Sequence, residues 1–167
     1  MKISIIGTGY VGLVSGACLA EKDHQVICVD KDIEKVKKIK NAVSPIHEDG
    51  LNKLLDANIN KNMKVTTNLN DAVMNTQVSI LAVGTPFNGK EIDLNYINQA
   101  VKEIGLVLHQ KNEYHVVIVK STVVPGTTDN VILPLLEKCS GKKAGQDFGV
   151  GMNPEFLREG SAVQDFM

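Results

Sequence analysis

Three glycines near the start of the chain could shape a phosphate-binding turn. Gly7, Gly9 and Gly12 have the spacing G-x-G-x-x-G directly after an apolar run. In this pattern the first glycine permits a tight turn, the second lets the backbone approach a pyrophosphate, and the third lets a helix pack closely on the preceding strand. The amides and the positive dipole end at the start of that helix attract phosphate. The alternative interpretation is a glycine-rich turn that binds nothing.

An acidic residue lies where a dinucleotide-binding turn needs one. Asp30 comes 21 residues after Gly9, at the end of a second apolar run, where a carboxylate can accept hydrogen bonds from a ribose diol. Because a carboxylate repels a 2′-phosphate, Asp30 favours NAD over NADP. Lys31 and Lys35 leave the opposite interpretation open, since either ammonium could pair with such a phosphate. The turn and the acid together predict a dinucleotide-binding site.

The elements that must position these residues alternate along the chain. Short apolar runs predict strands, and four of the runs are continuous, which is typical of strands buried on both faces of a parallel sheet. Helical patterns lie between the runs, with Asp32, Asp49 and Asp93 as predicted N-caps and a further helix starting at Thr127 or Thr128. We therefore predict an α/β fold of the Rossmann type, with a doubly wound, mainly parallel sheet and helices on both faces. The predicted strands are residues 2–6, 25–30, 64–66, 78–83, 116–120 and 148–152.

Polar side chains follow three of the later predicted strands. Ligands of open parallel sheets bind beyond the carboxyl ends of the strands. We therefore expect these side chains at the cofactor cleft, although each hydroxyl could instead form a cap or turn, and the acids could begin a solvated helix. The hydroxyl residues are Thr85, Ser121 and Thr122, and the acidic residues are Glu155 and Glu159.

Composition excludes several other classes of protein. Lys and Arg together number 18 and Asp and Glu 19, so the net charge of −1 does not fit a nucleic-acid-binding protein. No apolar run approaches the roughly 18 residues that span a bilayer, and we expect a cytoplasmic protein without a membrane partner. The cysteines and histidines have no metal-ligand spacing, so no metal is predicted. Cys18 and Cys28 are expected in the core, and the histidines at surface or strand-flanking positions.

Five ordered motifs carry a resemblance to a known family. Residues 7–13, 45–51, 84–86, 121–127 and 153–160 together resemble the UDP-glucose/GDP-mannose dehydrogenase family. The resemblance implies that residues 1–167 are its N-terminal NAD-binding domain, without the central helix and the C-terminal sugar-nucleotide domain that follow in family members. It also implies that the full-length protein is a homodimer. The family reaction oxidises the C6 alcohol of a nucleotide sugar to a carboxylate with two molecules of NAD.

The resemblance also implies roles for individual residues. Those expected at the NAD pyrophosphate are Gly7, Gly9, Tyr10, Val11 and Gly12, and those at the adenosine ribose are Asp30 and Lys35. Thr85, Pro86, Ser121 and Thr122 are expected along the cofactor, with Thr122 organising a catalytic water and Glu159 bordering the nicotinamide. Glu155 is expected to be the general acid or base near C6, and Phe156, Leu157 and Arg158 to contact the substrate.

The resemblance leaves the substrate open. Within the family, the motifs look most like those of enzymes that oxidise UDP-glucose to UDP-glucuronate, so UDP-glucose is the expected partner. GDP-mannose and UDP-N-acetylmannosamine are the alternatives, and a non-catalytic module that senses NAD is an alternative of another class. The cysteine, lysine and asparagine that catalyse the family reaction lie outside this chain. We therefore expect the chain alone to bind NAD without turnover.

Overall fold

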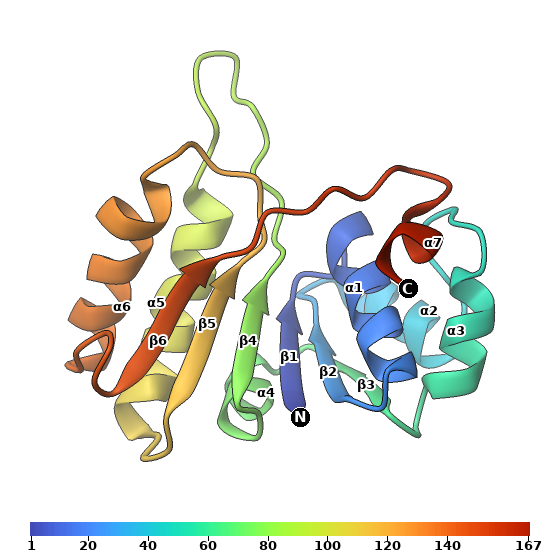
Figure 1. The fold of residues 1–167 in the computed structure, drawn as a ribbon, viewed down its shortest axis with the longest axis horizontal. Coiled ribbons are helices and arrows are strands. Elements are labelled where there is room, and N and C mark those ends of the chain that lie inside the picture. Colours follow the sequence, from blue (N-terminus) through green and yellow to red (C-terminus); the bar gives the residue numbers. More distant parts are fainter.

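Six strands form one sheet in which every neighbouring pair runs parallel (Figure 1). They are β1 (Lys2–Ile6), β2 (Gln25–Val29), β3 (Met63–Thr66), β4 (Val78–Leu81), β5 (His115–Val119) and β6 (Phe148–Met152). The computed structural model describes all of residues 1–167. Across the sheet the order is β3-β2-β1-β4-β5-β6, which confirms the predicted doubly wound fold. Every predicted strand is present, with ends that agree within two residues.

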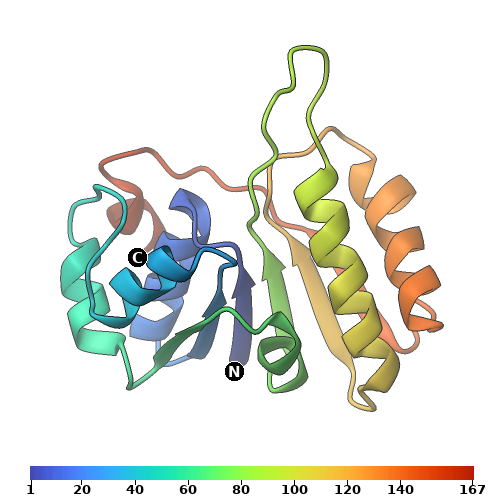
Figure 2. The ribbon, with the colours of Figure 1, turned by 180° about the vertical axis from the view of Figure 1, so that it is seen from behind.

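Helices pack on both faces of the sheet (Figures 1 and 2). One face carries α1 (Tyr10–Glu21), α3 (Leu51–Asn58) and α7 (Ala162–Phe166) over β1–β3. The other face carries α4 (Leu69–Met74), α5 (Asn95–Gln110) and α6 (Leu133–Ser140), and α2 (Ile33–Lys40) lies next to β3. None of these helices combines enough length with enough apolar character to cross a bilayer.

The helix starts test the predicted caps. Asp32 caps α2 as predicted, since its carboxylate accepts hydrogen bonds from the amides of Glu34 and Lys35. The N-cap of α5 is Leu94 rather than Asp93 as predicted, and Asp93 accepts a hydrogen bond from the amide of Asn95, the first residue of the helix, at 2.8 Å.

Two other helix starts differ from the prediction or extend it. Asp49 does not cap α3: Gly50 precedes the helix with φ 80°, and no side chain caps its first amides. The helix expected at Thr127 or Thr128 begins as a π-helical turn, Thr128–Ile132, and continues into α6. Pro134 is tolerated at the start of α6, where its missing N–H would have no helical partner.

The first helix lies unusually close to the sheet. A Cβ atom added at Gly16 would lie 2.6 Å from Sγ of Cys28, and a Cβ at that distance cannot be accommodated without a shift. Cys18 and Cys28 are fully buried, as expected. A small residue at position 16 is therefore what lets α1 approach β2 and hold the turn before it against the sheet.

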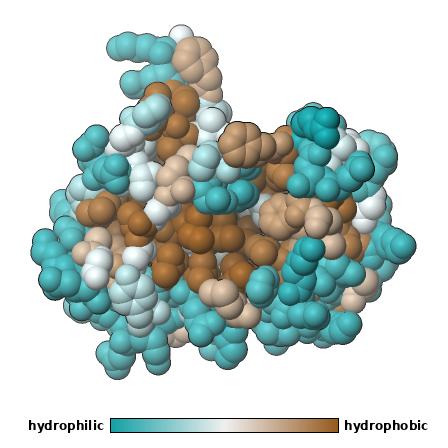
Figure 3. All heavy atoms as spheres, in the orientation of Figure 1, coloured by the Kyte–Doolittle hydropathy of each residue, from teal (hydrophilic) through white to brown (hydrophobic).

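Part of one sheet face has no helix over it. On the face shown in Figure 1, no helix covers β4–β6, and Figure 3 shows apolar side chains gathered over the centre of this face. Val116 and Ile118 of β5 are only half-buried there, and their register partners in β6 are Gly149 and Gly151. This strip of sheet is therefore both apolar and accessible.

A buried polar network lies near the amino ends of the strands, whereas the glycine turn lies at their carboxyl ends. His115 begins β5, which agrees with the predicted strand-flanking position, and it is fully buried. Its Nε2 lies 2.8 Å from Oγ of Ser79, and its Nδ1 lies 3.1 Å from Nζ of Lys111. The Lys111 ammonium donates to the carbonyls of Val73, Met74 and Thr76 and so caps the end of α4. A sequence pattern for surface helices cannot reveal such a non-local cap.

Protonation of His115 is expected to destabilise the fold. Burial, together with the Lys111 charge, lowers the pKa of His115 to about 4. In the unfolded chain the pKa is about 6.5, so between those values the unfolded state binds a proton that the folded state does not. The free energy of unfolding should therefore fall by about 2 kcal/mol from pH 7 to pH 4.5 on account of this residue.

Urea denaturation at the two pH values measures the effect. His115→Gln is the matched comparison, because it keeps a polar partner for Ser79 but does not titrate. The carboxylates affect the wild type and the variant equally. The difference between the two proteins in how the free energy of unfolding changes with pH is therefore the contribution of His115. Equal slopes would contradict the prediction.

Candidate functional site

The candidate site lies where the strand order reverses. β1 pairs with β2 on one side and with β4 on the other, so the chain leaves β1 and β4 at the same edge of the sheet but connects to opposite halves. The glycine turn follows β1, and a loop starting near Gly84 follows β4. Ligands of open α/β sheets bind in the crevice at this switch point.

The turn after β1 needs glycine for two separate reasons. Gly7 has φ 99°, and a Cβ there would lie 2.7 Å from the carbonyl oxygen of Ala82. A Cβ at Gly12 would lie 1.9 Å from the carbonyl oxygen of Gly7, which no side chain can accommodate. The start of α1 is thus pressed against the end of β1, as the spacing predicts.

The start of α1 is free to bind an anion. Gly9 is the N-cap, no side chain caps the helix, and the Leu13 amide bonds to the Gly9 carbonyl. A Cβ added at Gly9 would meet no atom within 4 Å, so open space adjoins the amides of Tyr10 and Val11. Uncapped amides, a positive dipole end and room for a ligand fit a pyrophosphate.

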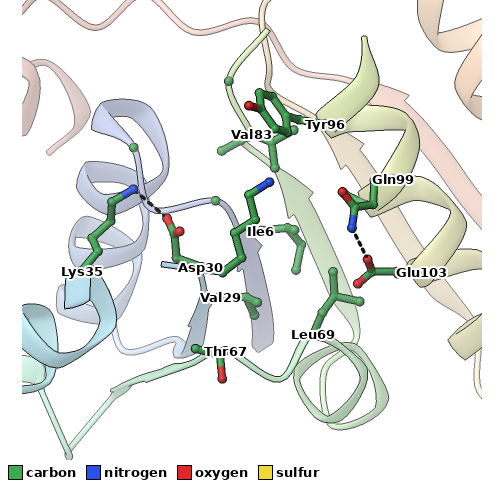
Figure 4. Close-up of a pocket in the computed structure, with 16 residues that line it drawn as sticks. Ile6, Val29, Asp30, Lys35, Thr67, Leu69, Val83, Tyr96, Gln99 and Glu103 are labelled. Carbon is green, nitrogen blue, oxygen red and sulfur yellow. Dashed lines mark hydrogen bonds and ion pairs between the residues drawn. The ribbon is translucent and has the colours of Figure 1, made fainter. Parts of the chain in front are cut away.

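A cavity of about 400 Å³ opens beside this turn (Figure 4). Its walls are the glycine turn, the end of β2, the loop before α4, the loop after β4 and the first turns of α5. The wall is apolar at Ile6, Val29 and Leu69, and polar groups stand at its rim. A cavity with a mainly apolar wall and a few polar groups fits one nucleoside.

Asp30 is held in place at the rim of this cavity. Its Oδ2 accepts hydrogen bonds from the amide and hydroxyl of Thr8 at 2.9 and 2.7 Å and from Nζ of Lys35 at 3.0 Å. Its Oδ1 accepts one from the amide of Asp32 and keeps room for a ligand hydroxyl. Burial opposes ionisation, but these hydrogen bonds outweigh it and hold the pKa of Asp30 below its ordinary value.

The two lysines beside Asp30 are both engaged. Lys35 forms the ion pair with Asp30 just described, so its charge is already balanced. Nζ of Lys31 lies 4.2 Å from the centre of the Tyr96 ring, in a cation–π contact at the cavity. The ionised acid is therefore central and the lysines are secondary, which supports the preference for NAD over NADP.

The ends of β4 and β5 are joined by the predicted hydroxyl residues. Thr85 donates its hydroxyl to the carbonyl of Thr122 at 2.6 Å, which brings these two predicted residues together. The Ser121 hydroxyl is buried and donates to the carbonyl of Val83 at 2.7 Å, so it holds the two loops together. The carbonyl of Pro86 accepts the Asp93 amide, which closes the loop that projects above the sheet.

The acidic motif lies on a segment that crosses the switch point. We call residues 153–161 the crossing segment: it runs from the end of β6 over the ends of β4 and β1 to α7 (Figures 1 and 2). Glu155 is half-buried and its Oε2 accepts a hydrogen bond from the Leu157 amide at 2.6 Å. Glu159 is exposed, and Phe156 is 86% exposed. Their predicted roles in binding and catalysis remain predictions.

Arg158 is engaged within the chain itself. Its guanidinium forms a two-point ion pair with Asp165, at 3.1 and 2.6 Å. This pair raises the pKa of Arg158 and lowers that of Asp165. A substrate that used Arg158 would therefore compete with Asp165 for the guanidinium.

Sequence reasoning missed three residues at the site. Thr8 holds Asp30, Tyr96 lines the cavity, and Lys120 donates to Oδ1 of Asn153 at 2.9 Å. A hydroxyl residue between two glycines of the turn was a usable signal for Thr8. Tyr96 and Lys120 gave none, because an aromatic residue on a helix and a lysine at a strand end are most often ordinary surface residues.

Comparisons with known proteins agree with this geometry. Residues 1–167 match the model of the NAD binding domain of the UDP-glucose/GDP-mannose dehydrogenase family. The chain is 49% identical over 169 residues to GDP-mannose 6-dehydrogenase of Pseudomonas aeruginosa, covering 99% of this chain and 38% of that protein. It is 43% identical over 168 residues to a UDP-glucose 6-dehydrogenase of Haloferax volcanii, covering 100% of this chain and 39% of that protein.

The fold is equally similar to a solved structure. A crystal structure of a ternary complex of GDP-mannose dehydrogenase from Pseudomonas aeruginosa superimposes with a TM-score of 0.97 at 48% identity, covering 99% of this chain and 38% of that one. The chain thus spans well under half the length of these relatives.

Removal of the Asp30 carboxylate is expected to weaken NAD binding. Asp30→Ala should raise the Kd for NAD at least tenfold, because a hydrogen bond to a charged group contributes roughly 1.5–3 kcal/mol. The preference for NAD over NADP should shrink at the same time, since no carboxylate would repel the 2′-phosphate.

Isothermal titration calorimetry with both dinucleotides tests this. Asp56→Ala is the control, because Asp56 is an exposed acid in α3 away from the cavity. An Asp30→Ala variant that binds NAD as tightly as the control would show that the acid is not part of the site.

Proposed function

Because this chain belongs to the UDP-glucose/GDP-mannose dehydrogenase family, we propose that it is the cofactor-binding part of an enzyme that oxidises a nucleotide sugar at C6. The observation that carries the proposal is that the cavity beside the glycine turn and the acid-bearing crossing segment both lie at the switch point of the sheet (Figure 1). A module that only senses NAD would need the cavity and the glycine turn, but neither Glu155 nor Glu159.

The cofactor half of the proposed reaction follows from the geometry. Bound NAD supplies the hydride acceptor for oxidation of an alcohol. The amides at the start of α1 hold its pyrophosphate, and Asp30 holds the adenosine ribose against the cavity. Thr85 and Thr122, which bond to each other at the ends of β4 and β5, are then the groups nearest the other half of the cofactor.

The proton half of the reaction is assigned to the crossing segment. Oxidation of an alcohol releases a proton as well as a hydride, so a base must lie near the sugar. We assign that role to Glu155, whose carboxylate is oriented by the Leu157 amide. Glu159 would border the nicotinamide, while Phe156, Leu157 and Arg158 would contact the sugar nucleotide.

We propose GDP-mannose as the substrate to test first. The sequence motifs alone favoured UDP-glucose, but GDP-mannose 6-dehydrogenases have higher identity to this chain than the UDP-glucose enzymes to which it was compared. UDP-glucose and UDP-N-acetylmannosamine remain the alternatives.

A direct comparison of substrates tests this choice. We expect the complete enzyme that contains this chain to have its highest kcat/KM with GDP-mannose, at least tenfold above UDP-glucose and UDP-N-acetylmannosamine. NADH absorbance measures all three rates under the same conditions. A higher kcat/KM with either UDP-sugar would contradict the choice of substrate and leave the proposed class of reaction standing.

The chain by itself is expected to bind NAD without turnover. The family resemblance implies a catalytic cysteine, and no thiol here suits that role. Burial raises the pKa of Cys18 to about 11 and that of Cys28 to about 12, so both stay protonated, and Cys139 lies in α6 beside Gly105.

Two measurements on the 167-residue chain test this expectation. Calorimetry should show saturable NAD binding, and addition of GDP-mannose or UDP-glucose should give no NADH. The complete GDP-mannose 6-dehydrogenase of Pseudomonas aeruginosa serves as the positive control for the assay. Steady NADH production by the chain would show that the catalytic groups are already present in it.

A further inference from the structure

A buried carboxylate outside the predicted site holds the far end of the crossing segment. Glu48 lies in the loop between α2 and α3 and is 6% exposed. Apart from its place in one of the five motifs, no sequence pattern assigns a function to an acid at this position. The structure brings it against α1, the crossing segment and the start of α7.

Glu48 uses both of its oxygens. Oε2 accepts hydrogen bonds from the Tyr10 hydroxyl and from the Gly160 amide, the latter at 2.8 Å. Oε1 accepts a hydrogen bond from the Val163 amide at 3.2 Å. The Tyr10 hydroxyl also lies 3.1 Å from the Gly160 nitrogen and 3.2 Å from the Arg158 carbonyl oxygen, so Tyr10 and Glu48 grip the same short stretch.

This carboxylate has no cationic side chain as a partner. The ion pairs of the chain involve Asp30, Glu34, Glu137 and Asp165, and none involves Glu48. Burial opposes its ionisation, yet the hydroxyl and amide hydrogen bonds keep the pKa of Glu48 below its ordinary value. Burial, and then the bond to Glu48, raise the pKa of Tyr10 to about 12, so its hydroxyl stays a donor. A buried charge held only by uncharged donors is costly to lose, because those donors are then left unpaired.

These contacts matter for the candidate cofactor site because Tyr10 lies beside it. Tyr10 is the first residue of α1, directly after Gly9, so its backbone belongs to the predicted pyrophosphate site. Its side chain reaches Glu48 and the crossing segment. One side chain therefore links the turn that would bind phosphate to the segment that carries the acids.

The crossing segment is anchored at its two ends and little between them. At the near end, Lys120 donates to Oδ1 of Asn153 at 2.9 Å. At the far end, Glu48 and Tyr10 contact the amide of Gly160. Between these ends Phe156 is exposed and only Leu157 packs against the apolar core, so the position of Glu155 and Glu159 depends largely on the two ends.

We propose that Glu48 is a positioning residue that, together with Tyr10, fixes the crossing segment over the cofactor site. This inference rests on the proposed function, since it assigns the acids of the segment to the nicotinamide half of NAD. Glu48 itself touches neither the cavity nor the acids. It acts through the main chain of residues 158–163.

The effect should therefore be confined to one half of the cofactor. Loss of the Glu48 contacts releases the segment but leaves the cavity, Asp30 and the glycine turn in place. Binding of NAD should weaken, because the segment no longer borders the nicotinamide. Binding of ADP-ribose, which lacks the nicotinamide, should not change. General destabilisation of the fold would weaken both ligands alike.

The experiment compares Glu48→Gln and Glu48→Ala with wild type and with Glu113→Gln, an exposed glutamate before β5 at the opposite edge of the sheet. In both Glu48 variants we expect amide hydrogen exchange at residues 158–163 to be at least tenfold faster than in wild type, because the hydrogen bonds that close this segment are lost. Calorimetry should show a Kd for NAD raised about fivefold or more, a change of roughly 1 kcal/mol, and a Kd for ADP-ribose within about twofold of wild type.

Each outcome decides a separate point. Unchanged exchange at residues 158–163, or an equal loss of affinity for NAD and ADP-ribose, would overturn the positioning role of Glu48. Failure of the wild-type chain to bind NAD would instead overturn the proposed function, whatever the exchange data show. If Glu48→Ala does not fold, Tyr10→Phe removes the hydroxyl alone and should show the same faster exchange.

Discussion

The structure depends on a contact between two pieces of backbone. The carbonyl of Gly7 lies where a side chain at position 12 would have to be, so the end of β1 and the start of α1 approach as closely as main chains can. This approach aims uncapped amides at the space beside Gly9. It also brings Thr8 to Asp30, so the end of β2 is tied to the same turn. The predicted phosphate-binding turn and the predicted ribose-binding acid are thus one assembly rather than two sites.

The second half of the sheet lines the cavity with the loop after β4 and the start of α5, and it also contributes loops outside the cavity. Thr85 and Thr122 join the ends of β4 and β5, and the crossing segment then returns over the switch point to the first half. Its far end meets Tyr10 and Glu48, which belong to the half that carries the glycine turn and Asp30. The chain therefore passes back over the switch point and ends on the half that carries the glycine turn. Arg158 and Asp165 form their ion pair within this return path.

Local sequence patterns predicted most of the fold and part of the candidate site. Apolar runs predicted all six strands, and four of these runs are continuous, as is typical of strands in a parallel sheet. The prediction of Asp32 as a cap was correct, whereas that of Asp49 was wrong, because Gly50, in a left-handed conformation, is the residue that precedes α3. Glu48 and Lys111 could not have been assigned from sequence, since each acts on main-chain groups that only the fold brings near. The burial of His115 has the same cause: its partners come from other elements.

The close packing of α1 on β2 also affects which cysteine thiols an oxidant can react with. Conversion of a thiol to a sulfenic acid adds an oxygen atom to sulfur, and the space beside the Cys28 sulfur does not admit even a methyl group at position 16. Burial keeps the thiols of Cys18 and Cys28 protonated, and therefore poorly reactive toward peroxide. Cys139, which is only partly buried and lies near the end of α6, is left as the thiol most accessible to peroxide.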